Sequence, residues 1–526
     1  MRRSLHVVSN HVPRRLKMSS DHKSNSASND DQVKMKSLHT SGGGSGQQDK
    51  TTTSNQTSFS GLTRSSTEDS ASMITYTEAT QKSSFVAVLM EKESTSDIFW
   101  QTLIPFMVGG LGSVACGLIV NRAQKTDLVC EVPHLIAICV PLQGMKGNLD
   151  MTFTSRLGTM AHRGRLRDSG YARRILRSIA LLEAQGIFIS LFSVLITFAL
   201  EGLLQSRKKQ PPVGDFLFLG SNSLFAMCIA SAISSVAMVV LVVYSYRKAI
   251  NPDNIGTPIA ASCGDLLTIM AMLVIGVFYY PIAMVSNWIS CSVMAAFLAT
   301  TPFFLFIAHK DDEAWIAARQ QGPTFLLAAI LSSAAGLVQA YGAMSFPELT
   351  VYQPLVAATS GNRASVQSAR ISSYLNTYKG PNRLKMRLNP WIYYTSADHE
   401  SRAAFLILMT SVPYQLAFVL LSHAVAYVAL APLRLNILFL LGYLITVFIQ
   451  SFILLYLAEV VVYSLFHFGI DPDLHAIPLL TSIGDLLGTA LLFVLFLLTS
   501  ISPEVVVVSE PPSGLLANAN KTCSYE

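Results

Sequence analysis

Residues 252–270 read PDNIGTPIAASCGDLLTIM, and residues 472–490 read PDLHAIPLLTSIGDLLGTA. Each stretch contains Pro-Asp, a second proline and a Gly-Asp-Leu-Leu motif at matched spacing, 220 residues apart. The aspartates of the two motifs, Asp265 and Asp485, lie inside apolar runs long enough to cross a bilayer. A carboxylate at that depth is costly, so by default it marks a pathway for ions or protons. The pair predicts a duplicated membrane protein that brings two equivalent acids together.

The composition is that of a polytopic membrane protein. The 526 residues are 51% hydrophobic and 13% charged, and the mean hydropathy is +0.43. The net charge of +6 is modest, and the basic residues gather in loops between apolar runs. Membrane topology explains that distribution better than nucleic-acid binding does. The seven cysteines are scattered and show no metal-ligand spacing.

Apolar segments long enough for a membrane span, which takes about 20 residues, occur along most of the chain. The eleven predicted spans are 98–120, 132–157, 176–204, 216–246, 256–281, 285–308, 324–345, 350–375, 402–430, 435–466 and 476–500. The second and eighth are apolar only in their first halves, which indicates helices that are broken or exposed to a cavity at mid-depth. The expected fold class is an all-α polytopic membrane protein.

Loop charges predict the orientation in the membrane. Lys and Arg concentrate in alternate loops, dominated by Arg163, Arg165, Arg167, Arg173, Arg174, Arg177, Lys379, Arg383, Lys385, Arg387 and Arg402. The positive-inside rule then places the N-terminus in the cytosol. Residues 1–95 are rich in Ser, Thr, Asn, Gln and Gly, which predicts a disordered tail. Its basic start is compatible with a mitochondrial transit peptide, but a cytosolic basic tail is the preferred interpretation. The plasma membrane is therefore the predicted location, and the mitochondrial inner membrane is the alternative.

A second motif repeats ahead of each Gly-Asp motif. This motif is Gly-Asn with an Arg eight residues after the Asn. Its two copies are Gly147-Asn148…Arg156 and Gly361-Asn362…Arg370. Each unit therefore has five spans, with the Asn motif in the second and the Asp motif in the fifth. The extra span 285–308 returns the chain to its starting side. The two units are then expected to be parallel, related by a pseudo-two-fold axis along the membrane normal, and to need no oligomer because the repeat replaces a dimer.

This layout predicts five regions. They are an N-terminal tail (1–95), a first repeat (96–282), a linker span with its loop (283–322), a second repeat (323–500) and a C-terminal tail (501–526).

Together the two motifs predict an all-oxygen cation site. Its expected ligands are the carboxylates of Asp265 and Asp485 and the amide oxygens of Asn148 and Asn362. Hard cations take such a set, whereas no thiolate or imidazole cluster suits zinc or copper. Two carboxylates fit a divalent ion, and Mg²⁺ keeps several waters when so few carboxylates hold it. The structural alternative is a pair of buried aspartates that join helices by hydrogen bonds.

Accessory roles are predicted for a further set of residues. They are Asp150, Glu459, Ser262, Ser482, Gly264 and Gly484. The serines share a helix face with the aspartates, and the glycines permit close approach of another helix. Asp150 and Glu459 have no acidic counterpart in the other repeat. Glu459 is a candidate proton or sodium coupling site, or a helix-anchoring group.

Four longer motifs carry a family resemblance. They are Lys146-Gly147-Asn148-Leu149-Asp150-Met151, Asn251-Pro252-Asp253-Asn254-Ile255, Tyr352-Gln353-Pro354 with Gly361-Asn362, and His467-Phe468-Gly469-Ile470-Asp471-Pro472-Asp473 with Ile483-Gly484-Asp485. Over residues 96–500 the chain resembles solute carrier family 41, the eukaryotic relatives of the bacterial MgtE magnesium transporters. The resemblance implies Mg²⁺ transport without a cofactor, and it puts Asp265 and Asp485 at the pore cation site. It also implies Na⁺/Mg²⁺ exchange, or a channel-like path as in the bacterial relatives.

Arg363 departs from the family pattern, which usually has Leu after the Asn of this motif. A guanidinium beside a cation path repels the cation unless it is paired or points away.

An intramembrane aspartyl protease is the rival hypothesis, because two aspartates on separate membrane helices can share a proton. Such enzymes pair Tyr-Asp with Gly-x-Gly-Asp, but Ser262 and Ser482 replace the first glycine here and no Tyr-Asp lies in a predicted span. The equivalent contexts of the two acids favour a symmetric ion path. The sequence therefore predicts a Mg²⁺ transporter rather than an enzyme, with Na⁺-coupled exchange as the main hypothesis and an uncoupled channel or uniporter as the alternative.

Overall fold

A computed structural model describes most of the chain beyond the predicted N-terminal tail. The described residues are 95–162, 170–204, 213–247, 252–377, 386–429 and 436–500. All of them belong to one compact unit, Ser72–Glu526. The predicted C-terminal tail and all but the last residue of the predicted N-terminal tail lie outside these ranges.

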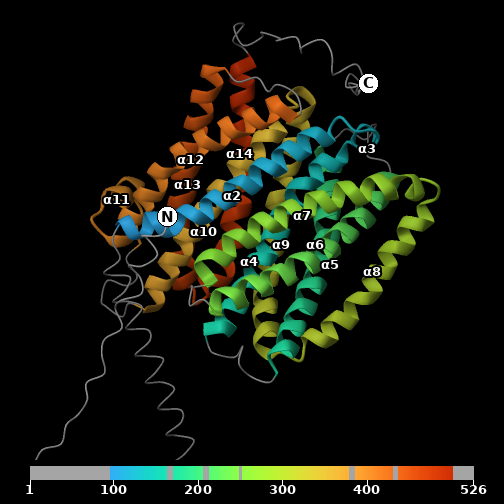
Figure 1. The fold of residues 1–526 in the computed structure, drawn as a ribbon, viewed down its shortest axis with the longest axis horizontal. Helices are drawn as coiled ribbons and strands as arrows, with labels where there is room; N and C mark the ends of the chain where they lie inside the picture. The colour runs from blue at the N-terminus through green and yellow to red at the C-terminus, as the bar shows by residue number, and fades with distance from the viewer. Residues whose placement is uncertain are drawn as a thin grey trace, which may run out of the picture. The chain divides into compact units, whose positions relative to one another are not determined.

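Within the described ranges the chain is built from helices and short connections (Figure 1). The helices are α2 (Thr95–Ala123), α3 (Asp127–Glu131), α4 (His134–His162), α5 (Tyr171–Leu204), α6 (Val213–Arg247), α7 (Pro252–Ala283), α8 (Asn287–Ala308), α9 (Asp312–Ser345), α10 (Leu349–Thr377), α11 (Pro390–Thr395), α12 (His399–Ala429), α13 (Ile437–His467) and α14 (Pro472–Ser500). Apart from the short α3 and α11, each helix coincides with one predicted span. The predicted all-α membrane class is confirmed.

Nine of the described helices are long and apolar enough to cross a membrane. The two long helices outside this set are α4 and α10, the second and eighth predicted spans. Both run unbroken through an internal proline, Pro141 in α4 and Pro354 in α10, so the prediction of a break is wrong. The alternative, exposure to a cavity, is the one that the structure bears out. Their polar residues are mostly buried against other helices, which hides them from lipid.

Equivalent helices of the two halves pack in the same way. Helix α4 packs against α6 and α7, and α10 packs against α13 and α14. The α4–α7 crossing brings the Cα of Gly147 within 3.6 Å of the Cβ position of Gly264. The α10–α14 crossing brings the Cα of Gly361 within 3.7 Å of that of Gly484. The glycines therefore allow the close helix approach that their sequence positions predict.

The first helix of each predicted repeat is shared between the halves. Helix α2 packs against α10 and α12 as well as α7, while α9 packs against α4 and α5 as well as α14. A Cβ on Gly117 of α2 would lie 2.1 Å from the carbonyl oxygen of Val351, and one on Gly336 of α9 would lie 1.9 Å from that of Ala137. The two crossings are equivalent, as expected of a duplication, whereas the direction of the axis stays a prediction.

Helix α8, the predicted linker span, lies at the margin of the other helices (Figure 1). It packs mainly on α5 and α6, and Ser290 and Ala308 are its buried residues. Trp288, Phe303 and Phe306 are exposed, as suits a helix surface in contact with lipid. It takes no part in the centre formed by α4, α7, α10 and α14.

Candidate cation site

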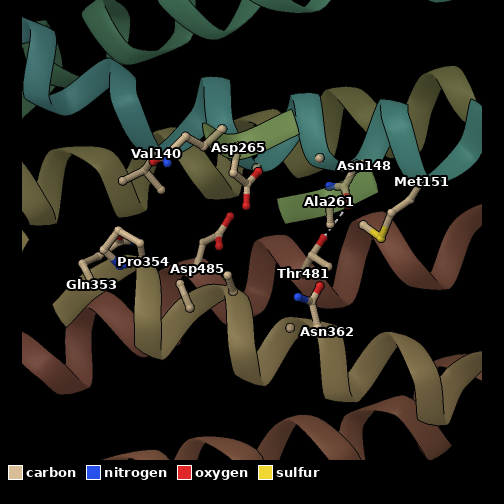
Figure 2. A pocket seen from close by; sticks show the side chains of 16 residues that line it. Val140, Asn148, Met151, Ala261, Asp265, Gln353, Pro354, Asn362, Thr481 and Asp485 are labelled. Carbon is tan, nitrogen blue, oxygen red and sulfur yellow. Dashed lines mark hydrogen bonds between the residues drawn. The ribbon is translucent and has the colours of Figure 1, made fainter. Parts of the chain in front are cut away.

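A cavity of about 50 Å³ lies between α4, α7, α10 and α14. All four residues predicted as cation ligands line it: Asp265 from α7, Asp485 from α14, Asn148 from α4 and Asn362 from α10 (Figure 2). Each half thus contributes one carboxylate and one amide. The structure brings together residues that are far apart along the chain.

The two carboxylates point toward one another across the cavity (Figure 2). Glycines on α4 make room for both of them. A Cβ on Gly144 would lie 2.7 Å from Oδ2 of Asp485, and one on Gly147 would lie 2.9 Å from Oδ1 of Asp265. Because these glycines are about one helical turn apart, one face of α4 accommodates the acid of each half.

The two carboxylates differ in their hydrogen bonds. Oγ of Ser332, on α9, donates to Oδ2 of Asp485 at 2.8 Å. Asp485 is 9% exposed, whereas Asp265 is only partly buried and accepts no hydrogen bond from the described residues. Asp485 is therefore held in one orientation, and Asp265 is the freer of the two.

The asparagines also differ in their surroundings. Oδ1 of Asn148 accepts a hydrogen bond from Oγ1 of Thr481 on α14 at 3.0 Å, which ties the first half to the second. Its Nδ2 has no hydrogen-bond partner among the described residues. Asn362 lies against α2, where its Nδ2 is 3.3 Å from the Cβ position of Gly109. An amide oxygen has two lone pairs, so that of Asn148 retains one for a cation.

Neither predicted accessory serine reaches the cavity. Oγ of Ser482 donates to the carbonyl oxygen of Pro478 in its own helix at 2.8 Å. Ser262 lies against α2, beside the Cβ positions of Gly109 and Gly112. Their positions on the aspartate helices serve helix packing rather than the cavity wall.

Glu459 is buried in α13, outside the cavity lining. Its Oε1 lies 3.3 Å from Nη1 of Arg387, which also pairs with Asp398. Partial burial raises the pKa of Asp398, but hydrogen bonds from Arg387 and Ser396 outweigh it and hold that pKa below its ordinary value. Of the two roles considered for Glu459, the contacts favour helix anchoring over ion coupling.

The guanidinium of Arg363 points away from the cavity. It lies over the rings of Phe106 at 5.0 Å and Tyr414 at 5.4 Å, and Nη1 donates to the carbonyl oxygen of Thr359 at 3.3 Å. Arg363 is 1% exposed and does not line the cavity. Aromatic rings thus take the place of a counter-ion, and the positive charge is kept behind α10.

Several residues of the site are missing from the sequence prediction. Thr481, Gln143, Gln353 and Gly144 line the cavity, and Ser332 holds Asp485. The Gly144–Gly147 spacing on α4 is a signal that could have been used. Nothing in the sequence connects Ser332 with Asp485, because the first helix of a repeat has no predictable contact with the fifth. The described ranges contain no group of three or more His, Cys, Asp or Glu that could hold a metal ion.

A family model for MgtE, described as a divalent cation transporter, matches residues 139–275 and 353–495. The first match contains Asn148 and Asp265, and the second contains Asn362 and Asp485. The doubled match and the apolar helices define an integral membrane transporter rather than an enzyme. The aspartyl protease hypothesis is therefore wrong.

Curated relatives narrow the class. Solute carrier family 41 member 3 of Rattus norvegicus is 32% identical over 415 residues, covering 77% of this chain and 88% of the relative. Member 2 of Gallus gallus is 32% identical and member 2 of Homo sapiens 31% identical over 416 residues, each covering 77% of this chain and 71% of the relative. The chain belongs to solute carrier family 41, within the MgtE type of divalent cation transporters.

Proposed function

We propose that the transported divalent cation is Mg²⁺ and that it passes between Asp265 and Asp485. The observation that carries this proposal is the pair of carboxylates pointing toward one another from equivalent positions in the two halves. The remaining polar side chains of the lining, those of Asn148, Asn362, Gln143, Gln353 and Thr481, offer amide and hydroxyl groups. An all-oxygen set suits a hard cation, and the described lining offers no imidazole or thiolate.

The size of the cavity supports a partly hydrated ion. A cavity of about 50 Å³ is larger than a single water requires, so it has room for an ion that keeps part of its water. Mg²⁺ prefers octahedral coordination and retains water when only one or two carboxylates bind it. Two carboxylate oxygens would leave the other octahedral positions to water or to the amide oxygens of the lining.

Sodium-coupled exchange is the proposed mode, and an uncoupled channel or uniporter is the alternative. Support for exchange comes from the family resemblance. Glu459 no longer supports it, because Arg387 occupies one of its oxygens. A coupling ion that shares the Asp265–Asp485 cavity would need no further acid.

Location, orientation and assembly belong to the same proposal. The distribution of basic residues in the loops supports a cytosolic N-terminus, and the plasma membrane is the proposed location. Both carboxylates of the cavity come from one chain, which supports transport by a single protomer.

The experiment is Mg²⁺ flux into proteoliposomes that carry an internal Mg²⁺ indicator and the full-length chain. Asp265→Asn, Asp485→Asn and the double variant keep the side-chain shape but remove the charge, so flux should fall to the level of protein-free vesicles. Asp312→Asn, at the exposed start of α9, is the matched control and should transport normally. Undiminished flux in the double variant would overturn the site.

An imposed Na⁺ gradient tests the mode in the same vesicles. Exchange requires that Mg²⁺ flux follow the direction and size of that gradient. Flux that ignores the gradient would replace exchange with a channel or uniporter and leave the site assignment untouched.

A further inference from the structure

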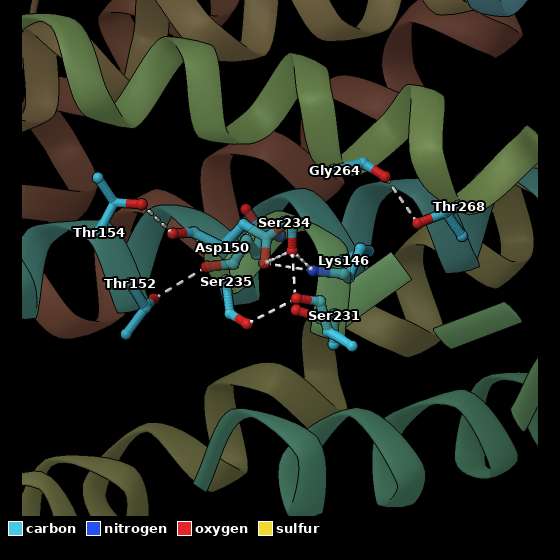
Figure 3. Close-up of polar contacts among 11 residues, drawn as sticks. Lys146, Asp150, Thr152, Thr154, Ser231, Ser234, Ser235, Gly264 and Thr268 are labelled. Carbon is cyan, nitrogen blue, oxygen red and sulfur yellow. Dashed lines mark hydrogen bonds and ion pairs between the residues drawn. The ribbon is translucent and has the colours of Figure 1, made fainter. Parts of the chain in front are cut away.

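An ion pair lies behind the cavity wall in the first half. Lys146 and Asp150 are one turn apart on α4, and both side chains are fully buried. Nζ of Lys146 contacts Oδ1 of Asp150 and donates to Oγ of Ser234 on α6 at 2.8 Å (Figure 3). Ser234 in turn donates to the same Oδ1 at 3.1 Å. The ammonium therefore has a buried anion and a hydroxyl as its partners.

The pair lies next to the Asp265 carboxylate. Lys146 directly precedes Gly147, whose Cβ position is 2.9 Å from Oδ1 of Asp265. The second oxygen of Asp150, Oδ2, has no hydrogen-bond partner among the described residues. It lies 2.6 Å from the Cβ position of Gly264, the residue before Asp265. Only the glycine crossing of α4 and α7 separates the pair from the cavity, and charges at such depth are poorly screened by water.

The second half has a neutral arrangement in the same place. Ser360 and Ala364 occupy the positions equivalent to Lys146 and Asp150, 214 residues further on. Oγ of Ser360 lies 3.4 Å from Oγ of Ser451 on α13, the helix equivalent to α6. Packing of these helices therefore does not require an ion pair at this position. The Lys146–Asp150 pair of the first half needs an explanation other than helix packing.

We propose that Lys146 is a tethered cation that sets the negative charge felt by an ion in the cavity, and that Asp150 keeps its ammonium away from Asp265. This inference rests on the proposed function, cation passage between Asp265 and Asp485. Lys146 and Asp150 neutralise one another, so the two carboxylates that line the cavity, Asp265 and Asp485, supply the two negative charges that balance one divalent ion. Lys146 touches no cavity ion and is a positioning residue acting through its charge.

The charges predict opposite effects for the two members of the pair. Lys146→Met leaves three carboxylates without a cation, so a divalent ion binds more tightly and leaves more slowly. Asp150→Asn leaves the ammonium without its anion, so that its positive charge acts on Asp265 uncompensated. The ammonium then competes with the transported ion. An ion pair with only a structural role would instead make both variants less stable and leave KM unchanged.

The test is the concentration dependence of Mg²⁺ flux in proteoliposomes containing the full chain. Lys146→Met should lower KM about tenfold, and Asp150→Asn should raise KM about tenfold, as expected for one unit charge near the site. Lys146→Met should also lower the maximal rate. The double variant Lys146→Ser with Asp150→Ala copies Ser360 and Ala364 and should restore the wild-type KM. Lys125→Met, an exposed lysine changed in the same way, is the matched control.

Two further variants keep the test decisive if the single variants fold poorly. Lys146→Arg keeps the charge and should keep KM, and the neutral double variant removes the cost of an unpaired buried charge. Unchanged KM in Lys146→Met, a KM of the double variant that stays shifted from the wild-type value, or shifts of the same sign in both single variants would each overturn the inference. The Asp265 and Asp485 variants separate this failure from failure of the site. If the Asp265 and Asp485 variants lose flux while Lys146→Met keeps a normal KM, the site assignment stands and only the proposed role of Lys146 is wrong.

Discussion

The two halves share one framework but surround their carboxylates differently. Asp485 is held by Ser332 from α9, and its side of the cavity has neutral Ser360 behind it. Asp265 accepts no hydrogen bond from the described residues, and the Lys146–Asp150 pair lies behind it. Duplication thus provides two matched acids, and later divergence around them makes one fixed and the other sensitive to a neighbouring charge.

The asymmetry extends to two other buried charges. Glu459 and Arg363 lie in the second half, where the first half has Val239 and Leu149. Each is accommodated by local partners, Glu459 by Arg387 and Arg363 by the rings of Phe106 and Tyr414. Neither lines the cavity, so these differences concern the stability of the second half rather than the path.

The largest expected effect on stability is that of Arg387→Ala, which leaves Glu459 buried without its cation. Loss of one partner of a buried pair costs about 3–5 kcal/mol. The thermal midpoint of the detergent-purified protein measures the loss. Adding Glu459→Val, which copies Val239, should recover most of it, and Glu459→Gln should keep Na⁺-dependent flux. Loss of Na⁺ dependence in Glu459→Gln would instead return this residue to the coupling role.

The shared helices α2 and α9 give the next largest effect. Gly117→Ala and Gly336→Ala each force a Cβ against a backbone carbonyl, and such overpacking costs about 1–3 kcal/mol. Both variants should lower the thermal midpoint by similar amounts. Gly322→Ala is the control in α9, because nothing lies within 4 Å of its Cβ position. If only one of Gly117→Ala and Gly336→Ala lowered the thermal midpoint, the two helix crossings would not be equivalent.

A smaller effect should follow removal of the Ser332 hydroxyl. Ser332→Ala leaves the Asp485 carboxylate without this hydrogen bond, and we expect KM for Mg²⁺ to rise about fivefold, equivalent to ~1 kcal/mol. Ser113 is the matched control, since it lies four residues before Gly117 as Ser332 does before Gly336, and donates to the carbonyl oxygen of Gly109. Equal KM shifts in Ser113→Ala and Ser332→Ala would contradict a specific role for Ser332.

The smallest effect is expected at Arg363. Two of its guanidinium nitrogens, Nε and Nη2, have no hydrogen-bond partner among the described residues. Replacing a buried charge by an apolar group of similar size is often neutral or stabilising, so Arg363→Met should change stability by only about 1 kcal/mol in either direction. Flux should be unaffected because the guanidinium points away from the cavity. A changed KM would show that its charge reaches the cation path.

Much of the site was predictable because its residues lie in repeated motifs. Asp265, Asp485, Asn148 and Asn362 line one cavity, as their matched spacing predicts. The accessory serines lie outside the cavity lining, because helical spacing defines a shared face but not how wide the cavity is. Ser332 could not be predicted, since its bond to Asp485 joins residues 153 positions apart and belongs to a helix that crosses between the halves.

The sequence by itself determined the membrane class, the helix positions, the duplication and the identity of the paired acids, because long apolar runs and costly buried carboxylates leave few other arrangements. Only the tertiary structure decided which acid is held by Ser332, that Arg363 points away, and that Lys146 and Asp150 neutralise one another beside Asp265. Those outcomes depend on helix crossings where glycines let backbones touch. A crossing sets which side chains meet, and the spacing of glycines shows that a helix can be approached closely but not which helix approaches it.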